Sequence, residues 1–263
     1  MGGSDCVSAD GVVRYERRGV VGRITFDRAG ARNAMTWAMY DQVAAALDTL
    51  DADPTLRAAE LRGTHGHFVA GTDITQFEGF SGDDGVAYER RLEAIVSRLE
   101  NLRIPSVAVV QGHAAGAGLL FATACDFRIC TPDARFSAPI ARTVGNTLSL
   151  KSIARLVAHL GVARTKLLMM TAGVLEAEQA RSIGYVAAVV EATRLEQHVT
   201  EFIEKLVELA PNTLRATKQL VQRVLDASAA DAEDVVREIY GSRDFREGVN
   251  AFREKRPPRW EGE

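Results

Sequence analysis

Two runs of small residues, each placed directly after a β-like stretch, constrain the fold of this chain most strongly. The first covers residues 66–74 and follows residues 58–62, and the second covers residues 111–118 and follows residues 106–110. The second run leads directly into an apolar, helix-like segment at residues 119–124. Small residues let the backbone turn tightly, and a helix N-terminus adds partial positive charge. The two runs therefore predict loops that aim main-chain N–H groups at one developing oxyanion.

The order of the expected elements indicates α/β architecture. Strands at residues 12–17 and 20–26 form a hairpin, and further strands fall at 58–62, 106–110, 127–130, 135–137 and 185–190. Helices alternate with these strands, the first capped by Thr36, which favours parallel pairing. A stretch rich in Gly, Asp and Ser, residues 76–85, is expected to be a mobile loop. After Arg194 the pattern is almost entirely helical, so we expect a core at residues 1–192 and a helical region at 193–263.

Composition excludes several classes of function. The net charge of −3 over 263 residues gives no reason to expect nucleic-acid binding, and no apolar run reaches the ~20 residues that span a membrane. The three cysteines, Cys6, Cys125 and Cys130, form neither a disulfide framework nor a zinc spacing, which favours a reducing cytoplasm. His65 and His67 lack a third ligand at a suitable spacing, so no metal site is expected. Fingerprints for dinucleotides, P-loops and nucleophile elbows are absent.

Four segments together resemble the crotonase superfamily, the enoyl-CoA hydratase/isomerase proteins. Residues 26–34 look like the family segment that lies along coenzyme A, and Phe68-x-Ala-Gly-x-Asp-Ile matches the first oxyanion loop. Residues 112–118 with Cys125-Asp126 match the second loop, and residues 247–257 match the C-terminal signature. Because the four occur in the usual order over nearly the whole chain, the resemblance is specific.

The resemblance implies a crotonase-like spiral of ββα units with a helical C-terminal region, assembled as a homotrimer or a dimer of trimers. It implies that the backbone N–H groups of Ala70 and Ala117 receive the thioester oxygen of an acyl-CoA in fatty acid metabolism. The family normally has glycine at the position of Ala117, where alanine can still donate if its φ is negative. Coenzyme A enters as part of the substrate, without a permanently bound cofactor. The residues implied to line its path are Gly30, Ala31, Arg32, Ala70, Gly71, Thr72, Asp73 and Ile74, with Phe252 and Lys255 near the nucleotide end.

One departure from the family limits the predicted reaction. Hydratase members use two glutamates, and the corresponding positions here are Leu120 and Ile140. A well-placed acid or base contributes roughly 10²–10⁴-fold to a rate, so ordinary hydration is expected to be very weak.

Several polar residues are candidate substitutes for the missing carboxylates. His113 can act as an acid or base near neutral pH, and Asn146 and Arg142 can bind an anion or orient a water molecule. Asp73 adjoins the first loop, although it can equally hold that loop by accepting N–H bonds. The acids at positions 78, 83, 84 and 89 are read as solvated surface, with the alternative that one of them swings over the thioester. Tyr88 is read as core, with the site as its alternative.

The sequence therefore predicts an acyl-CoA enzyme, a lyase or an isomerase, that stabilises a thioester enolate. An isomerase, a decarboxylase or a thioester hydrolase on the same scaffold remains open. A further alternative is a non-catalytic subunit that binds acyl-CoA.

Overall fold

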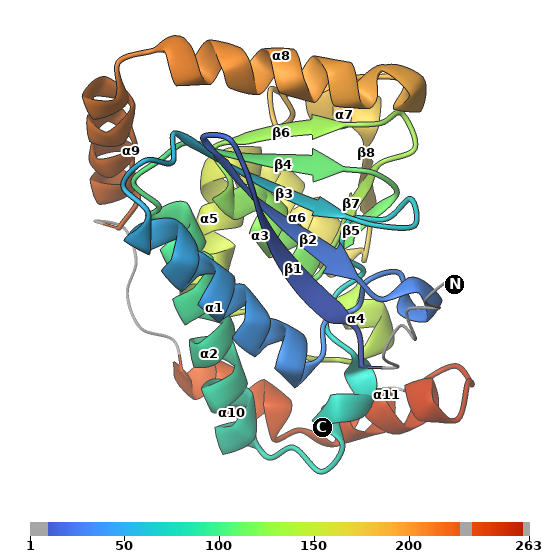
Figure 1. The fold of residues 1–263 in the computed structure, drawn as a ribbon. Coiled ribbons are helices and arrows are strands. Elements are labelled where there is room, and N and C mark those ends of the chain that lie inside the picture. The colour runs from blue at the N-terminus through green and yellow to red at the C-terminus, as the bar shows by residue number, and fades with distance from the viewer. Residues whose placement is uncertain (1–9, 227–232, 260–263) are drawn as a thin grey trace, which may run out of the picture.

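A six-stranded, mostly parallel sheet forms the centre of the protein (Figure 1). The computed structural model describes residues 10–226 and 233–259. The strands lie in the order β1 (Val12–Arg18), β2 (Val21–Asp27), β3 (Ala58–Gly63), β4 (Ser106–Val110), β6 (Phe127–Cys130) and β9 (Ala188–Val189). Only the β1–β2 pair is antiparallel among them. A second, three-stranded sheet contains β5 (His113–Ala115), β7 (Arg135–Ser137) and β8 (Val174–Glu176).

Helices cover both faces of the larger sheet. Alternate residues of β4 belong to different apolar clusters, as the period of two in a strand requires. Ala108 and Val110 pack in the main core with α1 (Trp37–Ala52), α2 (Gly82–Glu100) and α3 (Ala117–Ala124). Val107 and Val109 pack on the opposite face against α8 (Leu195–Glu208). The remaining helices of the α/β part are α4 (Ile140–Thr143), α5 (Leu150–Leu160), α6 (Val162–Met170) and α7 (Ala177–Ser182), with 3-10 turns at Ala29–Ala31, Ile74–Phe77 and Ala192–Arg194.

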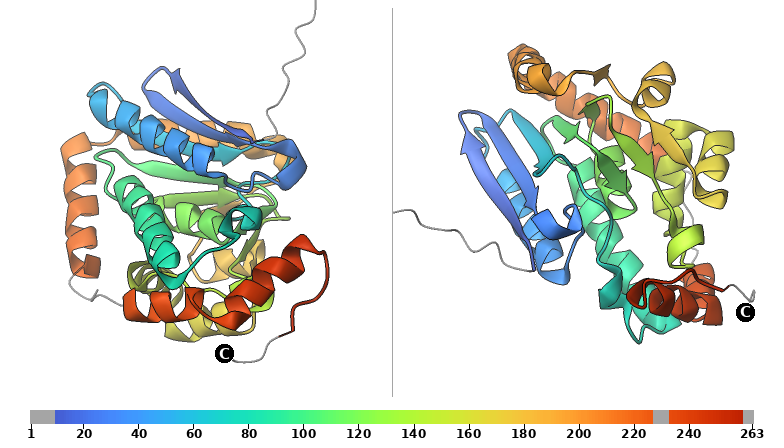
Figure 2. Two further views of the ribbon diagram at one scale, coloured as in Figure 1. Left: turned by 90° about the horizontal axis from the view of Figure 1, so that it is seen from below. Right: turned by 90° about the vertical axis from the view of Figure 1, so that its right-hand side faces the viewer.

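The described part of the C-terminal region is mostly helical. Its helices are α8, α9 (Pro211–Asp226), α10 (Glu233–Tyr240) and α11 (Arg243–Arg253). Helix α8 lies along one face of the sheet, whereas α10 and α11 lie beyond α2 on the other side (Figures 1 and 2). Tyr240 of α10 packs so closely on Gly85 of α2 that a Cβ at Gly85 would lie 2.1 Å from its ring. The division of the chain at residue 192 stays a prediction.

The predicted α/β class and helical C-terminal part are confirmed, and several element boundaries need correction. Thr36 caps α1 through its hydroxyl, and the strand at 106–110 has the expected bounds. The strand expected at 185–190 shortens to Ala188–Val189. Residues 76–85 were expected to be a loop, but Ser81 and Asp84 form a capping box and α2 begins at Gly82. This earlier start fixes which side of α2 faces the core.

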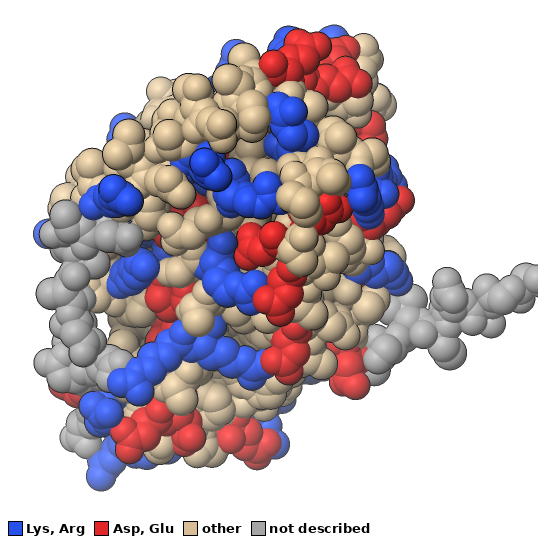
Figure 3. All heavy atoms as spheres, turned by 60° about the vertical axis from the view of Figure 1, so that its left-hand side comes forward, with Lys and Arg blue, Asp and Glu red and all other residues tan. Residues whose placement is uncertain are grey.

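Charged side chains form local pairs on the surface. On the face shown in Figure 3, basic and acidic side chains are interspersed. Ion pairs of 2.6 Å join α2 to α1, from Arg91 to Asp41 and from Arg98 to Asp48. Cys125 and Cys130 are buried free thiols, and Cys6 lies outside the described residues. Within the described ranges, no helix is both long and apolar enough to cross a membrane.

The two small-residue loops lie against each other at the carboxyl end of β3 and β4. The N–H of Val69 donates to the carbonyl of His113 at 3.0 Å, and the N–H of Ala115 donates to the carbonyl of Val69 at 2.9 Å. Gly118, in the first turn of α3, lies so close that a Cβ there would be 2.0 Å from the Val69 carbonyl oxygen. This close approach lets α3 begin beside the first loop.

We expect Gly118→Ala to lower the free energy of unfolding by about 1–3 kcal/mol, because the added methyl group overpacks against a backbone carbonyl. Gly30→Ala is the matched control, since a Cβ at Gly30 meets no atom within 4 Å. Urea unfolding of both variants checks this. Equal stability of the two variants would contradict the packing described for Gly118.

Candidate active site

A small cavity of about 70 Å³ lies where the two loops meet α2 and α4. Its wall is mostly apolar, with Ile74, Phe77, Leu92, Ile140, Val144 and Leu148. The backbone of both loops also reaches it, at residues 70–72 and 115–117. The side chains that bring polar atoms to its wall are Thr72, Tyr88, Glu89, Thr143 and Asn146. In such apolar surroundings, each polar group acts on a ligand more strongly than it does in water.

The expected oxyanion donors were the N–H groups of Ala70 and Ala117, and the first of these is not free. The N–H of Ala70 donates to the carbonyl of Arg32 at 3.1 Å, so it is already engaged. The carbonyl of Gly71 accepts from Met35 and the N–H of Asp73 donates to Met35, whereas the N–H groups of Gly71 and Thr72 have no acceptor among the described residues. Ala117 begins α3, and its N–H likewise has no acceptor in that part of the chain. The N–H groups of Gly71, Thr72 and Ala117 therefore remain for a bound oxygen, one or both of the first two from the first loop and the third from the second loop.

Ala117 has the negative φ that lets an alanine donate its N–H at this position. It lies in a right-handed helix and is not among the described non-glycine residues with positive φ. Gly116, the residue before it, has φ 50° and makes the turn that a side chain would hinder. The first turn of α3 thus presents its N–H groups to the cavity together with the positive end of the helix dipole.

The segment expected to lie along coenzyme A is adjacent to the first loop. Gly30 and Ala31 form a 3-10 turn, and Arg32 follows with φ 50°. The Arg32 carbonyl accepts from Ala70, and the N–H of Met35 donates to the carbonyl of Gly71 at 2.8 Å. Residues 30–35 and 70–73 therefore run side by side, as a shared binding path requires. The exposed Phe252 lies in α11 and Lys255 just after it, and their contact with a nucleotide stays a prediction.

Three hydroxyl groups form a chain beside the Thr72 amide. The Thr72 hydroxyl lies 2.6 Å from the Tyr40 hydroxyl and 2.7 Å from the Tyr88 hydroxyl. Tyr88 is 8% exposed and belongs to the main core, as predicted, and it also lines the cavity. Burial raises the pKa of Tyr88 well above its ordinary value and that of Tyr40 to about 12, so both stay neutral and able to donate.

Glu89 is the carboxyl group of this cavity, and the prediction that it is solvated was wrong. It is 3% exposed on α2. One oxygen accepts from the Tyr240 hydroxyl at 2.8 Å, and the other accepts from the N–H of Ser149 at 2.8 Å. Burial raises the pKa of Glu89 to about 7, and the charge of Glu93 adds to this, while the two hydrogen bonds oppose it. The group is thus close to half-protonated at neutral pH.

A helical pattern in the sequence could have located Glu89. Buried residues of α2 follow the positions 85, 89, 92, 96 and 99, which is the spacing of one helix face. Leu92, Val96 and Leu99 gave a clear stripe, and Glu89 continues it by one turn toward the N-terminus. Reading residues 76–85 as a loop hid this continuity.

Asn146 lines the cavity as expected for a residue facing the substrate. Its side-chain N–H donates to the Tyr240 hydroxyl at 2.8 Å, whereas its Oδ1 is buried with no hydrogen-bond partner among the described residues. Ile140 also lines the cavity, and Leu120 is fully buried in α3. Neither position expected to hold a catalytic glutamate supplies a polar atom here.

His113 and Asp73 are not among the described residues that line the cavity. The Nδ1 atom of His113 lies 3.4 Å from that of His67, and burial followed by the charge of Arg32 lowers the pKa of both. Asp73 caps the 3-10 turn at Ile74–Phe77 and pairs with Arg28 at 2.8 Å. Burial raises its pKa, but bonds from Thr75 and Arg28 outweigh this and lower it. Asp73 thus holds the first loop.

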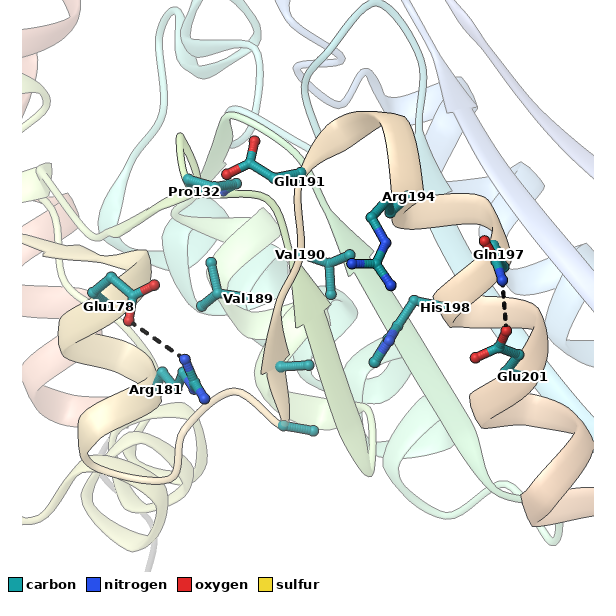
Figure 4. A pocket seen from close by; sticks show the side chains of 12 residues that line it. Pro132, Glu178, Arg181, Val189, Val190, Glu191, Arg194, Gln197, His198 and Glu201 are labelled. Atoms are coloured by element: carbon teal, nitrogen blue, oxygen red, sulfur yellow. Dashed lines mark hydrogen bonds and ion pairs between the residues drawn. The ribbon is translucent and has the colours of Figure 1, made fainter.

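A larger hollow of about 410 Å³ lies elsewhere, between α7, β9 and α8. Its side chains come from α7, β9, the first two turns of α8 and the segments beside them, and two pairs occupy part of its polar groups (Figure 4). Glu178 pairs with Arg181, and Gln197 donates to Glu201 at 2.9 Å. It contains none of the loop residues, so we place the candidate site in the smaller cavity.

Comparisons with known proteins show the family of the chain. A family model described as enoyl-CoA hydratase/isomerase matches residues 16–263. The chain belongs to the enoyl-CoA hydratase/isomerase family. A probable enoyl-CoA hydratase of Rhizobium meliloti is 31% identical over 92% of this chain and 94% of its own length. A short-chain-enoyl-CoA hydratase of Clostridium acetobutylicum is 30% identical over 93% of this chain and 95% of its own.

Solved structures of the family share this fold. A methylmalonyl-CoA decarboxylase in complex with 2-nitronate-propionyl-CoA superposes with a TM-score of 0.86 at 27% identity, covering 95% of this chain and 98% of its own. The predicted crotonase fold is thereby confirmed.

The buried Glu89 predicts a pH dependence of stability. The pKa of Glu89 rises from about 4.5 to about 7 on folding. Its contribution to the free energy of unfolding is therefore fully present below pH 4.5 and is lost as the pH rises through 7. At about 1.4 kcal/mol per pKa unit, we expect the free energy of unfolding of the wild type, relative to Glu89→Gln, to fall by about 3 kcal/mol from pH 4.5 to about 8. Denaturant unfolding across this range measures it.

The control is Asp83→Asn, which removes an 81% exposed carboxylate from the same helix. Its stability difference from the wild type should stay nearly constant across this pH range. A constant difference for Glu89→Gln as well would contradict the burial described for Glu89.

Proposed function

We propose that this protein binds an acyl-CoA thioester and stabilises its enolate with the N–H groups of Thr72 and Ala117. The observation that carries the proposal is that these two amides line one cavity and lack acceptors among the described residues. An enolate forms when the carbon next to the thioester loses a substituent, which leaves negative charge on the thioester oxygen. Removing one such donor typically costs about 3–4 kcal/mol of transition-state stabilisation. Thr72 takes the place first given to Ala70.

We propose proton transfer at the thioester α-carbon, as in an isomerase, as the reaction. Hydration needs a water molecule activated beside the double bond, and the positions expected to do this are Leu120 and Ile140. Several relatives are named hydratases, which supports the substrate class more than the reaction.

Decarboxylation is the second candidate. Loss of carbon dioxide from a malonyl-type thioester yields the same enolate without a base that removes a proton. Two structures named methylmalonyl-CoA decarboxylase superpose with TM-scores of 0.86 and 0.87, which favours this alternative over thioester hydrolysis. A non-catalytic acyl-CoA-binding subunit would share the cavity but show no turnover.

The proposal extends to assembly and location. We propose a homotrimer or a dimer of trimers in the cytoplasm, with the C-terminal helices contributing to coenzyme A binding. Large apolar side chains are exposed on α6 and β8, including Leu167 at 64% and Met170 at 75%, which supports a subunit contact there.

Incubation with butyryl-CoA in D₂O tests the enolate directly. We expect deuterium to enter the α-carbon at least ~10²-fold faster than in buffer, because the two amides lower the energy of the enolate. With crotonyl-CoA, we expect the hydroxyacyl product to form only slowly. Mass spectrometry follows both. Rapid hydration would contradict the proposed reaction. Binding of an acyl-CoA without deuterium exchange and without decarboxylation would favour the non-catalytic acyl-CoA-binding subunit.

Removing one amide tests the oxyanion donors. Ala117→Pro deletes the N–H at the first position of α3, where proline is tolerated, so the helix should persist. We expect the exchange rate to fall by about 10²–10³-fold. The control Ala117→Ser keeps the N–H and should retain most of the rate. An unchanged rate in Ala117→Pro would remove Ala117 from the proposed site.

A further inference from the structure

Glu89 differs from the other buried carboxyl groups of α2 in having no cationic partner. Glu93, one turn later, pairs with Arg155 at 2.7 Å, and Glu100 pairs with the same guanidinium at 2.8 Å. No lysine or arginine in residues 10–226 or 233–259 forms an ion pair with Glu89. The neighbours that bond to it are neutral, the Tyr240 hydroxyl and the Ser149 N–H. A buried carboxyl group without a neutralising cation is free to exchange a proton.

The carboxyl group lies in the same cavity as the proposed oxyanion donors. Tyr88, the residue before it on α2, bonds through its hydroxyl to the hydroxyl of Thr72. This contact holds α2 against the first loop, with Glu89 and the Thr72 backbone both on the cavity wall. A thioester whose oxygen accepts from Thr72 and Ala117 therefore has its α-carbon in the space that Glu89 borders.

Asn146 provides a second, independent sign that this wall meets a ligand. It donates to Tyr240, which in turn donates to Glu89, so the three side chains form one chain of hydrogen bonds. The Oδ1 of Asn146 is buried without a partner. Buried acceptors are nearly always satisfied in folded proteins, so an exception at a cavity wall indicates a donor supplied from the cavity, by a ligand or by a water molecule.

We propose that Glu89 is the proton-transferring residue of this cavity, oriented by Tyr240 and Asn146, and that its substrates are 3-enoyl-CoA thioesters. The proposal rests on the enolate function proposed above. The Glu89 carboxylate takes a proton from the α-carbon, so the C–H bond breaks and an O–H bond forms on Glu89. The electron pair enters the new C=C bond, and the thioester oxygen takes the negative charge. Glu89 then returns the proton to the γ-carbon, which gives the conjugated 2-enoyl thioester.

The charges around Glu89 set the pH at which it works. On α2, the charge of Glu93 raises the pKa of Glu89, although Glu93 is itself paired with Arg155 of α5. The neutral Tyr88 precedes Glu89 on the same helix. From α10, Tyr240 donates to it, and from the turn before α5, the Ser149 N–H donates to it. Burial dominates, and the pKa of Glu89 is about 7. Because the carboxylate is the active form, the rate should rise with pH and level off above that value.

Glu89→Gln tests the role in the full-length protein. With 3-butenoyl-CoA as the substrate, we expect the formation of crotonyl-CoA to fall by about 10²–10⁴-fold, since the amide cannot accept the proton. Binding of butyryl-CoA, measured by calorimetry, should change less than about tenfold. Asp83→Asn, the exposed acid of the same helix, should keep the wild-type rate.

Tyr240→Phe gives a readout that loss of structure does not imitate. Its hydroxyl lowers the pKa of Glu89 by donating to the carboxylate. Removal of the hydroxyl should therefore move the rising limb of the pH–rate profile to higher pH, while the plateau rate at high pH is largely retained. This variant decides the matter if Glu89→Gln fails to fold or to bind butyryl-CoA.

The outcomes separate this inference from the function on which it rests. If the wild type neither isomerises 3-butenoyl-CoA nor exchanges the α-protons of butyryl-CoA, the enolate function itself fails. If the wild type is active and Glu89→Gln keeps its rate, only the role of Glu89 is overturned. An unshifted profile in Tyr240→Phe would likewise overturn the proposed chain of hydrogen bonds.

Discussion

The backbone contact between Val69 and the second small-residue loop is the constraint on which the candidate site depends. Val69 exchanges hydrogen bonds with His113 and Ala115, and its carbonyl lies against the Cα of Gly118. These contacts hold the end of β3 against the start of α3, so the amides of Thr72 and Ala117 reach one cavity. Because the donors are backbone groups fixed by strands and a helix, they need little rearrangement to meet a developing charge.

Much of the fold and half of the site could be predicted from the sequence, because both are encoded locally. Small residues after strands indicated the loops, and Ala117 at a helix start indicated one donor. The second donor required knowledge of pairing between distant segments. The bond from Ala70 to the carbonyl of Arg32 reveals that the free amides of the first loop belong to the next two residues, Gly71 and Thr72. Such pairing leaves no trace in the order of the residues.

The burial of Glu89, the proposed acid–base group, was missed for a related reason. Glu89 has a polar side chain at a position whose burial depends on where α2 begins and on what packs against it. The capping box at Ser81 determines where α2 begins, and α10, some 150 residues later in the chain, packs against the Glu89 side of α2. An acidic residue is usually exposed, so composition favoured the wrong interpretation. The apolar stripe of α2 was the signal that could have outweighed it.

The bond between Tyr240 and Glu89 links the cavity of the proposed thioester cradle to the C-terminal region. The amides of Thr72 and Ala117 belong to a part of the chain that ends well before α10, and their positions rest on loop and strand contacts within it. The carboxyl group, by contrast, acquires its orienting hydroxyl only when α10 docks on α2. Oxyanion binding and proton handling thus have separate structural origins, so the C-terminal helices could alter the acidity of the site while the cradle itself stays unchanged.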